Sequence, residues 1–437
     1  MTTLDERTHD REFVRTFFTT PTAERGQEDS AKKLRGAIGL RGMQAPDVWV
    51  PDNEDATAPS MRDEGAENVA EVVAEGGADF PGEIHPRVVW HRDSPETRYR
   101  GFRHMLEIAD PSNGAVEHID GFVIPEVGGI DDWKKADEFF TIVENEHGLE
   151  EGSLAMSVII ESGAAELAMG RLREEMGKPT NNLERLFLLV DGEVDYTKDL
   201  RGITPTGGLP EWKELRHNTS RAASAAGCIA VDGPYDDIRD VEGYHDRITA
   251  NNAMGMLGIW SLTPGQVVEA NKSPLPPAAG YWTLSAGDRT IELEGRDGVE
   301  VYDGDLVELE ETNGGYEFEV DGDEHFLETD EELTEELLDM LDYVPSLDDV
   351  VDSMEEFEAA KEAGQGAIAM TRAATIEIDG VEVDVASDRM WDEATYQALQ
   401  TPITLFQDVY ENRPDQHDDL AELYSAEVVE RAMDVGN

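Results

Sequence analysis

Two stretches of the sequence decide the fold. Residues 156–161 read Met-Ser-Val-Ile-Ile-Glu, and residues 186–195 read Leu-Phe-Leu-Leu-Val-Asp-Gly-Glu-Val-Asp. Each is a short, mostly aliphatic run that ends directly in acidic residues. Such runs are typical of buried strands in a parallel sheet, where both faces of the strand are covered. In a barrel of such strands the functional side chains follow the carboxyl ends, so these acids are candidates for function.

The same pattern recurs along the first part of the chain. Candidate strands lie at residues 13–18, 48–50, 88–90, 122–125, 156–160, 186–190, 228–231 and 257–261. Helix-like stretches lie at residues 60–74, 97–109, 133–145, 164–175 and 244–256. Apolar strands mostly separated by helices predict an α/β fold, a closed (β/α)8 TIM barrel. A doubly wound open sheet is the alternative, but no glycine-rich phosphate-binding turn follows the first strand.

The pattern changes after residues 274–277, which read Pro-Leu-Pro-Pro. Residues 281–327 alternate polar and apolar positions between glycine-containing turns, which predicts antiparallel hairpins. Helices are expected at residues 331–341, at 346–363 and from 393 to about 433. The predicted domains are the barrel over residues 1–277, a small antiparallel β insert over 278–330 and a helical C-terminal extension over 331–437.

The charge of the chain is strongly negative. The sequence contains 97 Asp and Glu residues against 35 Lys and Arg, a formal net charge of −62. This charge repels nucleic acid phosphates and anionic membranes, so neither is an expected partner. With 39% hydrophobic residues and seven Trp, the composition favours a folded protein over a disordered one. In molar KCl the Debye length is about 3 Å, which screens self-repulsion, so a salt-accumulating cytoplasm is the expected setting.

The single cysteine, Cys228, excludes an internal disulfide framework and a metal site built from several cysteines. The first ten residues are polar and charged, unlike a signal peptide, and no apolar run reaches the length of a membrane span. We therefore expect a soluble, cytoplasmic protein.

The ends of the predicted strands carry a ring of carboxylates and one arginine. Arg87 lies beside the third strand, Glu161 follows the fifth, and Asp195 lies beyond the sixth. Carboxylates without histidine or cysteine companions favour a hard cation, and Mg²⁺ typically binds one or two of them. Glu161 and Asp195 are therefore the candidate Mg²⁺ ligands. The alternative is that these acids are simply solvated, because a chain so rich in acids places some at strand ends by chance.

Several segments resemble the citrate lyase β-subunit-like family and follow its order. They are residues 14–21, 48–59, 159–162 (Ile-Ile-Glu-Ser), 194–200 and 258–268. The resemblance covers about residues 12–277 and implies the barrel, a metal ligand at Glu161 and a second ligand at Asp195. The family's usual Ile-His-Pro is replaced here by Leu-Thr-Pro at residues 262–264, so a role for that histidine does not carry over.

The C-terminal part resembles the malate synthases. Residues 390–395 (Met-Trp-Asp-Glu-Ala-Thr) resemble the segment around the catalytic aspartate of those enzymes, and the acidic chain as a whole resembles their short halophilic archaeal form. The resemblance implies Mg²⁺-dependent condensation of acetyl-CoA with glyoxylate, followed by hydrolysis of malyl-CoA to malate and CoA, in the glyoxylate cycle. It also implies a homo-oligomer, a trimer or a hexamer.

The resemblance assigns the chemical steps to two residues. Asp392 is the expected base that removes a proton from the methyl group of acetyl-CoA, and Arg87 is expected to stabilise the enolate that results. Both residues also have a structural alternative. Asp392 is well placed to cap a helix that begins at Glu393, and Arg87 to form ion pairs within an acid-rich barrel.

Further residues are expected around the substrates. The backbone N–H groups of Glu193, Val194 and Asp195 are expected to bind the carboxylate of glyoxylate. Glu54 and Asp55 are expected to hold metal-bound water or to orient the arginine.

Three other functions remain open from the sequence. A malyl-CoA or related 3-hydroxyacyl-CoA lyase would use the same barrel, metal and arginine without net thioester hydrolysis. A non-catalytic protein that binds CoA or metal would keep the barrel without turnover, and a purely structural acidic protein would show neither property. The segment around Asp392 and the C-terminal extension favour the synthase over the lyase. The presence of Glu161, Asp195, Arg87 and Asp392 together argues against the non-catalytic protein.

Overall fold

The computed structural model describes residues 13–176, 183–202, 212–286, 289–293, 299–300, 310–312, 315–320, 323–328, 341–378 and 381–435. These residues form two compact units. The first contains the described residues up to Pro274 together with Tyr410–Asp419, and the second contains those of Leu275–Val409 and Leu420–Asn437.

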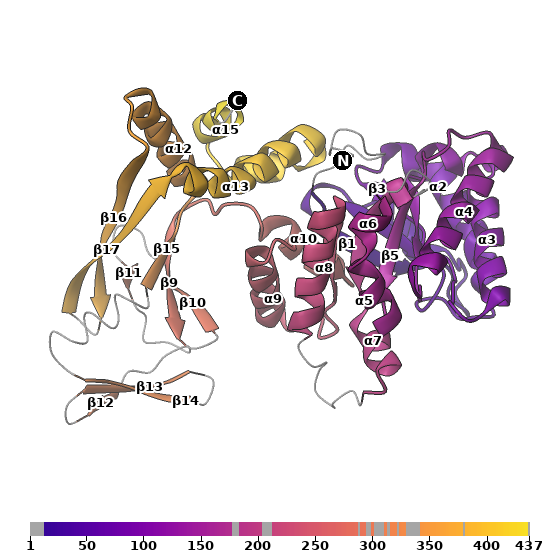
Figure 1. The fold of residues 1–437 in the computed structure, drawn as a ribbon, viewed down its shortest axis with the longest axis horizontal. Helices are drawn as coiled ribbons and strands as arrows, with labels where there is room; N and C mark the ends of the chain where they lie inside the picture. Colours follow the sequence, from indigo (N-terminus) through magenta and orange to yellow (C-terminus); the bar gives the residue numbers. More distant parts are fainter. Residues whose placement is uncertain are drawn as a thin grey trace. The chain divides into compact units, whose positions relative to one another are not determined.

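The first unit is built on eight parallel strands (Figure 1). They are β1 (Thr16–Pro21), β2 (Val48–Asp52), β3 (Glu83–Ile84), β4 (Gly121–Ile124), β5 (Ala155–Ile160), β6 (Leu186–Asp191), β7 (Ile229–Pro234) and β8 (Gly258–Ser261). Their order is β3-β2-β1-β8-β7-β6-β5-β4, so β8 pairs with β1, and β3 and β4 stand at the two ends of the order.

The segment after β3 brings these two ends together. The backbone of Arg87 forms isolated bridges with Asp52 beside it in β2 and with Val123 in β4. The N–H of Val123 donates to the carbonyl of Pro86 at 3.0 Å, which joins β4 to the same segment. The predicted (β/α)8 barrel is confirmed, and Arg87 lies on the seam where it closes.

One predicted strand is misplaced at this seam. The sequence predicts a strand at residues 88–90, but the structure has β3 at Glu83–Ile84 and only the bridge at Arg87. Pro86 explains the interruption, because proline has no N–H to donate to a strand ladder.

Helices surround the strands (Figure 1). They are α1 (Lys32–Ala37), α2 (Arg62–Gly76), α3 (Pro95–Ile108), α4 (Ile130–His147), α5 (Gly163–Met169), α6 (Leu172–Met176), α7 (Glu193–Asp199), α8 (Lys213–Ala226), α9 (Val241–Ala253) and α10 (Pro264–Lys272). The sequence did not predict α8. Its buried side chains are Leu215, Arg216, Thr219 and Ala223, so only one large apolar residue marks the face that identifies a helix.

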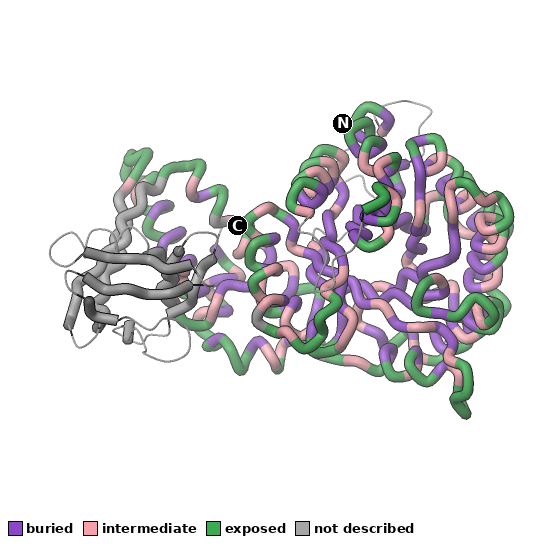
Figure 2. Tube along the Cα trace, turned by 90° about the horizontal axis from the view of Figure 1, so that it is seen from below, coloured by how far each residue is buried: buried purple, intermediate pink, exposed green. Residues whose placement is uncertain are grey.

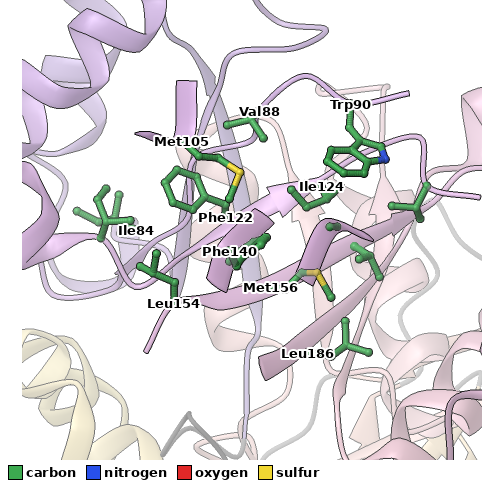
Figure 3. Close-up of a cluster of buried hydrophobic side chains, with 14 of the residues drawn as sticks. Ile84, Val88, Trp90, Met105, Phe122, Ile124, Phe140, Leu154, Met156 and Leu186 are labelled. Carbon is green, nitrogen blue, oxygen red and sulfur yellow. The ribbon is translucent and has the colours of Figure 1, made fainter. Parts of the chain in front are cut away.

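The strands are buried on both faces, and Figure 2 colours them as buried and much of the outer helical surface as exposed. In β2, Val48 and Val50 belong to the cluster inside the barrel, whereas Trp49 between them belongs to the cluster under the helices. Figure 3 shows part of that outer cluster, where Phe122 and Met156 of neighbouring strands lie near Phe140 of α4. Side chains of successive residues point to opposite faces of a strand, so each strand contributes to both cores.

The second unit combines strands and helices. Its strands are β9 (Tyr281–Ala286), β10 (Arg289–Leu293), β11 (Val299–Glu300), β12 (Glu310–Thr312), β13 (Gly315–Val320), β14 (Asp323–Glu328), β15 (Leu341–Val344), β16 (Ala367–Ile378) and β17 (Val381–Asp392). Its helices are α12 (Leu347–Glu362), α13 (Glu393–Asn412), α14 (His417–Leu423) and α15 (Ala426–Asp434), of which α13 and α14 extend into residues 410–419. The antiparallel hairpins expected in this region are present, because β9 pairs with β10, and β13 pairs with both β12 and β14.

Two features of this unit differ from expectation or lie beyond it. Residues 331–340 of the helix expected at 331–341 fall outside the described residues, and Leu341 begins β15. The long antiparallel pair β16–β17 was not predicted. Among the helices described, none is long and apolar enough to cross a membrane.

Residues 410–419 return from the second unit to the first. Arg413 is buried there, and its Nη1 lies 2.5 Å from Oδ1 of Asp47, just before β2. The same carboxylate accepts hydrogen bonds from Nη2 and Nε of Arg15 at 2.8 and 2.9 Å. Asp415 adds a contact by accepting the N–H of Gly42 at 3.1 Å. This segment therefore supplies part of the polar packing at the amino ends of the barrel strands.

Candidate active site

Arg87 is the most tightly held of the predicted site residues. Its Nε donates to Oδ1 of Asp52 at 2.7 Å and its Nη2 to Oδ2 at 2.5 Å. Its guanidinium carbon lies 5.3 Å from the centre of the Trp260 ring. Burial alone would lower the pKa of Arg87, but the charge of Asp52 outweighs that effect and raises it. Arg87 is therefore a fixed positive charge at any working pH.

Glu54 and Asp55 lie beside the remaining nitrogen of this arginine. The Nη1 of Arg87 lies 3.4 Å from Oε2 of Glu54 and 3.6 Å from Oδ2 of Asp55. Burial raises the pKa of Glu54 to about 9, because the attraction of Arg87 offsets only part of the cost of desolvation. The structure thus brings both predicted acids to Arg87, and their roles stay a prediction.

Glu161 follows β5 directly and is buried. Its Oε2 accepts a hydrogen bond from the N–H of Glu126 at 2.8 Å. Burial raises the pKa of Glu161 to about 8, against the effect of Arg87, and the charges of Asp195 and Asp55 raise it further. A carboxylate in this position lacks sufficient positive charge around it, which is the condition that a bound cation would relieve.

Two backbone features place Glu161. Glu126 has φ 45°, an uncommon conformation for a residue other than glycine, and it presents the N–H that Glu161 accepts. On the other side, Gly192 lies so close that a Cβ built on it would be 2.2 Å from Cγ of Glu161. Only glycine fits there, so the chain after β6 packs directly against this carboxylate.

Asp195 lies in the first turn of α7. Its Oδ1 is 2.6 Å from Nζ of Lys198, one turn further along the helix. The backbone N–H groups of Glu193, Val194 and Asp195 belong to the helix start, where such groups have no partner within the helix. The carboxylate of Glu193 is buried and forms ion pairs with arginines, so only its backbone is a candidate for substrate binding.

The two predicted ligands suit a hard cation that binds only one or two protein side chains. Within the part of the chain that the structure describes, no three His, Cys, Asp or Glu side chains gather closely enough to hold a metal ion together. Mg²⁺ is usually held by one or two carboxylates, with water and substrate oxygens completing its octahedron. Glu161 and Asp195 interact electrostatically and are both oxygen donors, so the donor set fits Mg²⁺.

Asp392 belongs to the second unit, whereas Arg87, Glu161 and Asp195 belong to the first. Asp392 ends β17 and caps α13, because its Oδ1 accepts the N–H groups of Ala394 and Thr395, both at 3.0 Å. Hydrogen bonding by Thr395 lowers the pKa of Asp392, which keeps the side chain ionised near neutral pH. The capping role considered from the sequence is therefore present, and catalysis by this carboxylate stays a prediction.

Two contributors to this site were not singled out from the sequence. Asp52 holds Arg87, and Gly192 packs on Glu161. The pairing of Asp52 with Arg87 follows from their register across β2 and the seam, which a single sequence does not reveal. The signal for Gly192 was its position immediately after a strand that ends in Asp191.

Comparisons with known proteins identify the family. A family model described as HpcH/HpaI aldolase/citrate lyase matches residues 37–263, and one described as malate synthase H C-terminal domain matches residues 282–397. The malate synthase of Haloferax volcanii is 77% identical over 433 residues, which cover 99% of this chain and 100% of that protein. The chain belongs to the malate synthase family. The family predicted from the sequence is thereby confirmed.

Other members of the malate synthase family and its relatives match as well. The apparent malate synthase of Haloarcula marismortui is 75% identical over 432 residues, covering 99% of both chains. The L-malyl-CoA/beta-methylmalyl-CoA lyase of Haloarcula marismortui is 39% identical over 273 residues, covering 60% of this chain and 76% of that protein. The synthases thus match along the whole chain, and the lyase along a part of it.

Solved structures of the Haloferax volcanii malate synthase resemble this family member along its length. Its magnesium/glyoxylate complex has a TM-score of 0.63 and 66% sequence identity, covering 98% of this chain and 100% of that chain. Its pyruvate/acetyl-CoA ternary complex has a TM-score of 0.61 and 71% sequence identity, with the same coverage.

Proposed function

We propose that this chain is a Mg²⁺-dependent malate synthase of the glyoxylate cycle. It would condense acetyl-CoA with glyoxylate and hydrolyse the resulting malyl-CoA to malate and CoA. The observation that carries the proposal is that Arg87 and Glu161 act on each other electrostatically in the barrel. The guanidinium of Arg87, held by Asp52, is permanently charged, and its attraction offsets only part of the cost of burying the Glu161 carboxylate. The likeness to malate synthases over 99% of the chain supports the same assignment.

Glu161 and Asp195 would hold the metal ion, which when bound polarises the aldehyde oxygen of glyoxylate as a Lewis acid. The backbone N–H groups of Glu193, Val194 and Asp195 would donate to the carboxylate of glyoxylate, since they lie in the first turn of α7. Together these contacts would orient the aldehyde carbon for attack.

Asp392 would act as the base for acetyl-CoA. Its lowered pKa keeps it ionised, and the cap hydrogen bonds to Ala394 and Thr395 fix its orientation through Oδ1. It would take a proton from the methyl group, and the charge of Arg87 would stabilise the enolate oxygen. The enolate carbon would then attack the aldehyde carbon of glyoxylate, and water would cleave the thioester of malyl-CoA.

The lyase remains the second candidate. The likeness to an L-malyl-CoA/beta-methylmalyl-CoA lyase, at 39% identity over part of the chain, favours it over a non-catalytic binding protein or a purely structural one. Glu54 and Asp55 beside Arg87 would serve either reaction, because each requires a stabilised enolate.

Purified protein in molar KCl with Mg²⁺, acetyl-CoA and glyoxylate tests the proposal through release of free thiol. Release that stops when any one component is omitted would support the synthase. Cleavage of malyl-CoA to acetyl-CoA and glyoxylate without thiol release would instead assign the lyase. Arg87→Lys keeps the charge but loses the two-point contact with Asp52, so it should lower the rate in either case.

We also propose that the protein acts in the cytoplasm as a homo-oligomer, a trimer or a hexamer, without nucleic acid or membrane partners. Its working division would be the barrel at residues 1–277, the β insert at 278–330 and the C-terminal extension at 331–437, which carries Asp392. The large negative charge supports the absence of nucleic acid and membrane partners, since it disfavours phosphate-bearing surfaces. Sedimentation in molar KCl that finds only a particle of one chain would refute the oligomer.

A further inference from the structure

Behind the first turn of α7 lies a closed ring of two arginines and two carboxylates. Arg216 of α8 places its Nε 3.0 Å from Oδ1 of Asp232 and its Nη2 3.0 Å from Oε1 of Glu193. Arg247 of α9 places its Nε 2.5 Å from Oδ2 of Asp232 and its Nη2 3.0 Å from Oε2 of Glu193. Each arginine thus contacts both acids, and each acid contacts both arginines.

The ring is buried and balanced in charge. Glu193 and Asp232 are 1% and 0% exposed, and both arginines are largely covered. Burial alone would raise the pKa of Asp232, but Arg247 and Arg216 outweigh it and hold the pKa below its usual value. Asn251 adds a hydrogen bond of 2.6 Å to Oδ2 of Asp232. Within the ring two positive groups face two negative ones. The carboxyl of Asp191 is also buried close by, and burial together with the charges of Asp232 and Glu193 raises its pKa well above its usual value.

The ring connects directly to the candidate metal ligands. Glu193 is the first residue of α7, and Asp195 lies two residues further on. Gly192, on the other side of Glu193, packs against Glu161 with no space for a Cβ. A Cβ on Gly233 of β7 would lie 3.3 Å from Cγ of Glu193, which is also tight. A displacement of Glu193 would therefore move both the support of Glu161 and the position of Asp195.

We infer that Arg216 and Arg247 are positioning residues, which anchor Glu193 to Asp232 of β7 and thereby set the spacing of Asp195 and Glu161 for the metal ion. The inference rests on the proposed function, because it assumes that these two carboxylates bind Mg²⁺. The acid of Glu193 is then a structural anchor, and its backbone alone faces the substrate side. A purely stabilising ion-pair ring, by contrast, would leave metal affinity unchanged.

Arg247→Lys in the full-length protein tests this directly. Lysine keeps the charge but cannot contact both acids with a planar fork. We expect the dissociation constant for Mg²⁺, or for Mn²⁺ as a probe, to rise about tenfold to a hundredfold in calorimetry without substrates, as for other residues that orient metal ligands. The KM for glyoxylate should rise with it. Arg216→Lys should behave alike and provides a second variant if the first does not fold.

Arg185→Lys is the matched control. Arg185 is also buried against two acids, with its Nε 2.5 Å from Oδ1 of Asp137 and its Nη1 2.5 Å from Oε1 of Glu144. It precedes β6 at the amino end of the strand, away from the end that leads to α7. The control should lower the melting temperature without changing metal affinity.

The outcomes distinguish a failure of the positioning role from a failure of the proposed function. Wild-type protein that binds metal, with both lysine variants binding equally well, would overturn the positioning role and leave the proposed function standing. An Arg185→Lys protein that loses metal affinity as strongly as Arg247→Lys would also overturn it, since any loss of stability would then suffice. Wild-type protein that binds neither Mg²⁺ nor Mn²⁺ would overturn the metal site itself, and the inference with it.

Discussion

Arg87 and Asp52 are joined twice, once through their backbones and once through their side chains. Their backbones pair as a parallel bridge, and the guanidinium donates to both carboxylate oxygens at 2.7 and 2.5 Å. Because Nε and Nη2 are engaged in this way, Nη1 is the nitrogen that faces Glu54 and Asp55. The barrel seam thus sets the direction in which the positive charge of Arg87 acts.

Asp52→Asn should lower kcat about tenfold to a hundredfold, because an arginine held at one point instead of two is misplaced relative to the reacting oxygen. The KM for acetyl-CoA should change less, and steady-state kinetics at saturating Mg²⁺ would measure both. Asp137→Asn, which removes a buried acid from Arg185 instead, should leave kcat near that of the wild type. An unchanged kcat in Asp52→Asn would contradict the orienting role.

Gly192→Ala should weaken Mg²⁺ binding about tenfold, since the new Cβ would lie 2.2 Å from Cγ of Glu161 and force it aside. The φ of −117° at Gly192 is open to alanine, so the effect would come from the contact and not from backbone strain. Calorimetry measures the affinity. Gly36→Ala in α1, where nothing lies within 4 Å of the added carbon, is the neutral comparison.

Asp392→Asn and Asp392→Ala separate the two roles of that residue. Asparagine caps a helix as well as aspartate does but is no base, so thiol release should fall about a hundredfold or more while the melting temperature stays the same. Alanine removes the contacts to Ala394 and Thr395 as well, so both quantities should fall. Full activity in Asp392→Asn would leave only the capping role.

His104 should make stability depend on pH. Its Nδ1 lies 3.2 Å from Nδ2 of Asn53 and its Nε2 3.0 Å from Oδ1 of Asp63, an arrangement that a neutral ring satisfies. Burial lowers the pKa of His104, with Asp63 opposing the shift. As the pH falls through about 6.5, the unfolded chain takes up a proton before the folded one does, so this residue's contribution to the free energy of unfolding declines.

His104 alone can change the free energy of unfolding by at most about 1.4 kcal/mol per pH unit, and this dependence on pH should vanish above about pH 7. The melting temperatures of wild-type protein and of His104→Gln, measured between pH 5 and pH 8, check this prediction. The many acids are common to both proteins, so the difference between the two curves reports on His104. Their melting temperatures should converge as the pH falls. Parallel curves would show that His104 does not titrate differently in the two states.

The strand ends were the part of the site that the sequence predicted best. Glu161 follows β5 and Asp195 lies just beyond β6, because aliphatic runs locate strands and strand ends locate the mouth of a barrel. The sequence could not predict which side chains contact one another across strands. The contact of Arg87 with Asp52, and the ring around Glu193, depend on register and on helix positions that one sequence does not determine.

Helices with polar inner faces were also missed. The inner face of α8 carries Arg216, which pairs with a buried acid, and Thr219 beside Leu215 and Ala223, so few large apolar residues mark this helix in the sequence. Similarly, α7 begins in an acidic stretch that resembles a loop, although acids in a first helical turn are favoured by the helix dipole.

The return of residues 410–419 to the barrel limits how this protein can be dissected. A fragment that ends at Pro274 would lose Arg413 from the buried carboxylate of Asp47 and Asp415 from the N–H of Gly42. Buried groups that lose a partner are costly, so such a fragment should fold poorly even though it contains every barrel strand. Any attempt to express the two halves of the gene separately, or to exchange the second half between related enzymes, would have to keep this ten-residue piece with the barrel to which it belongs.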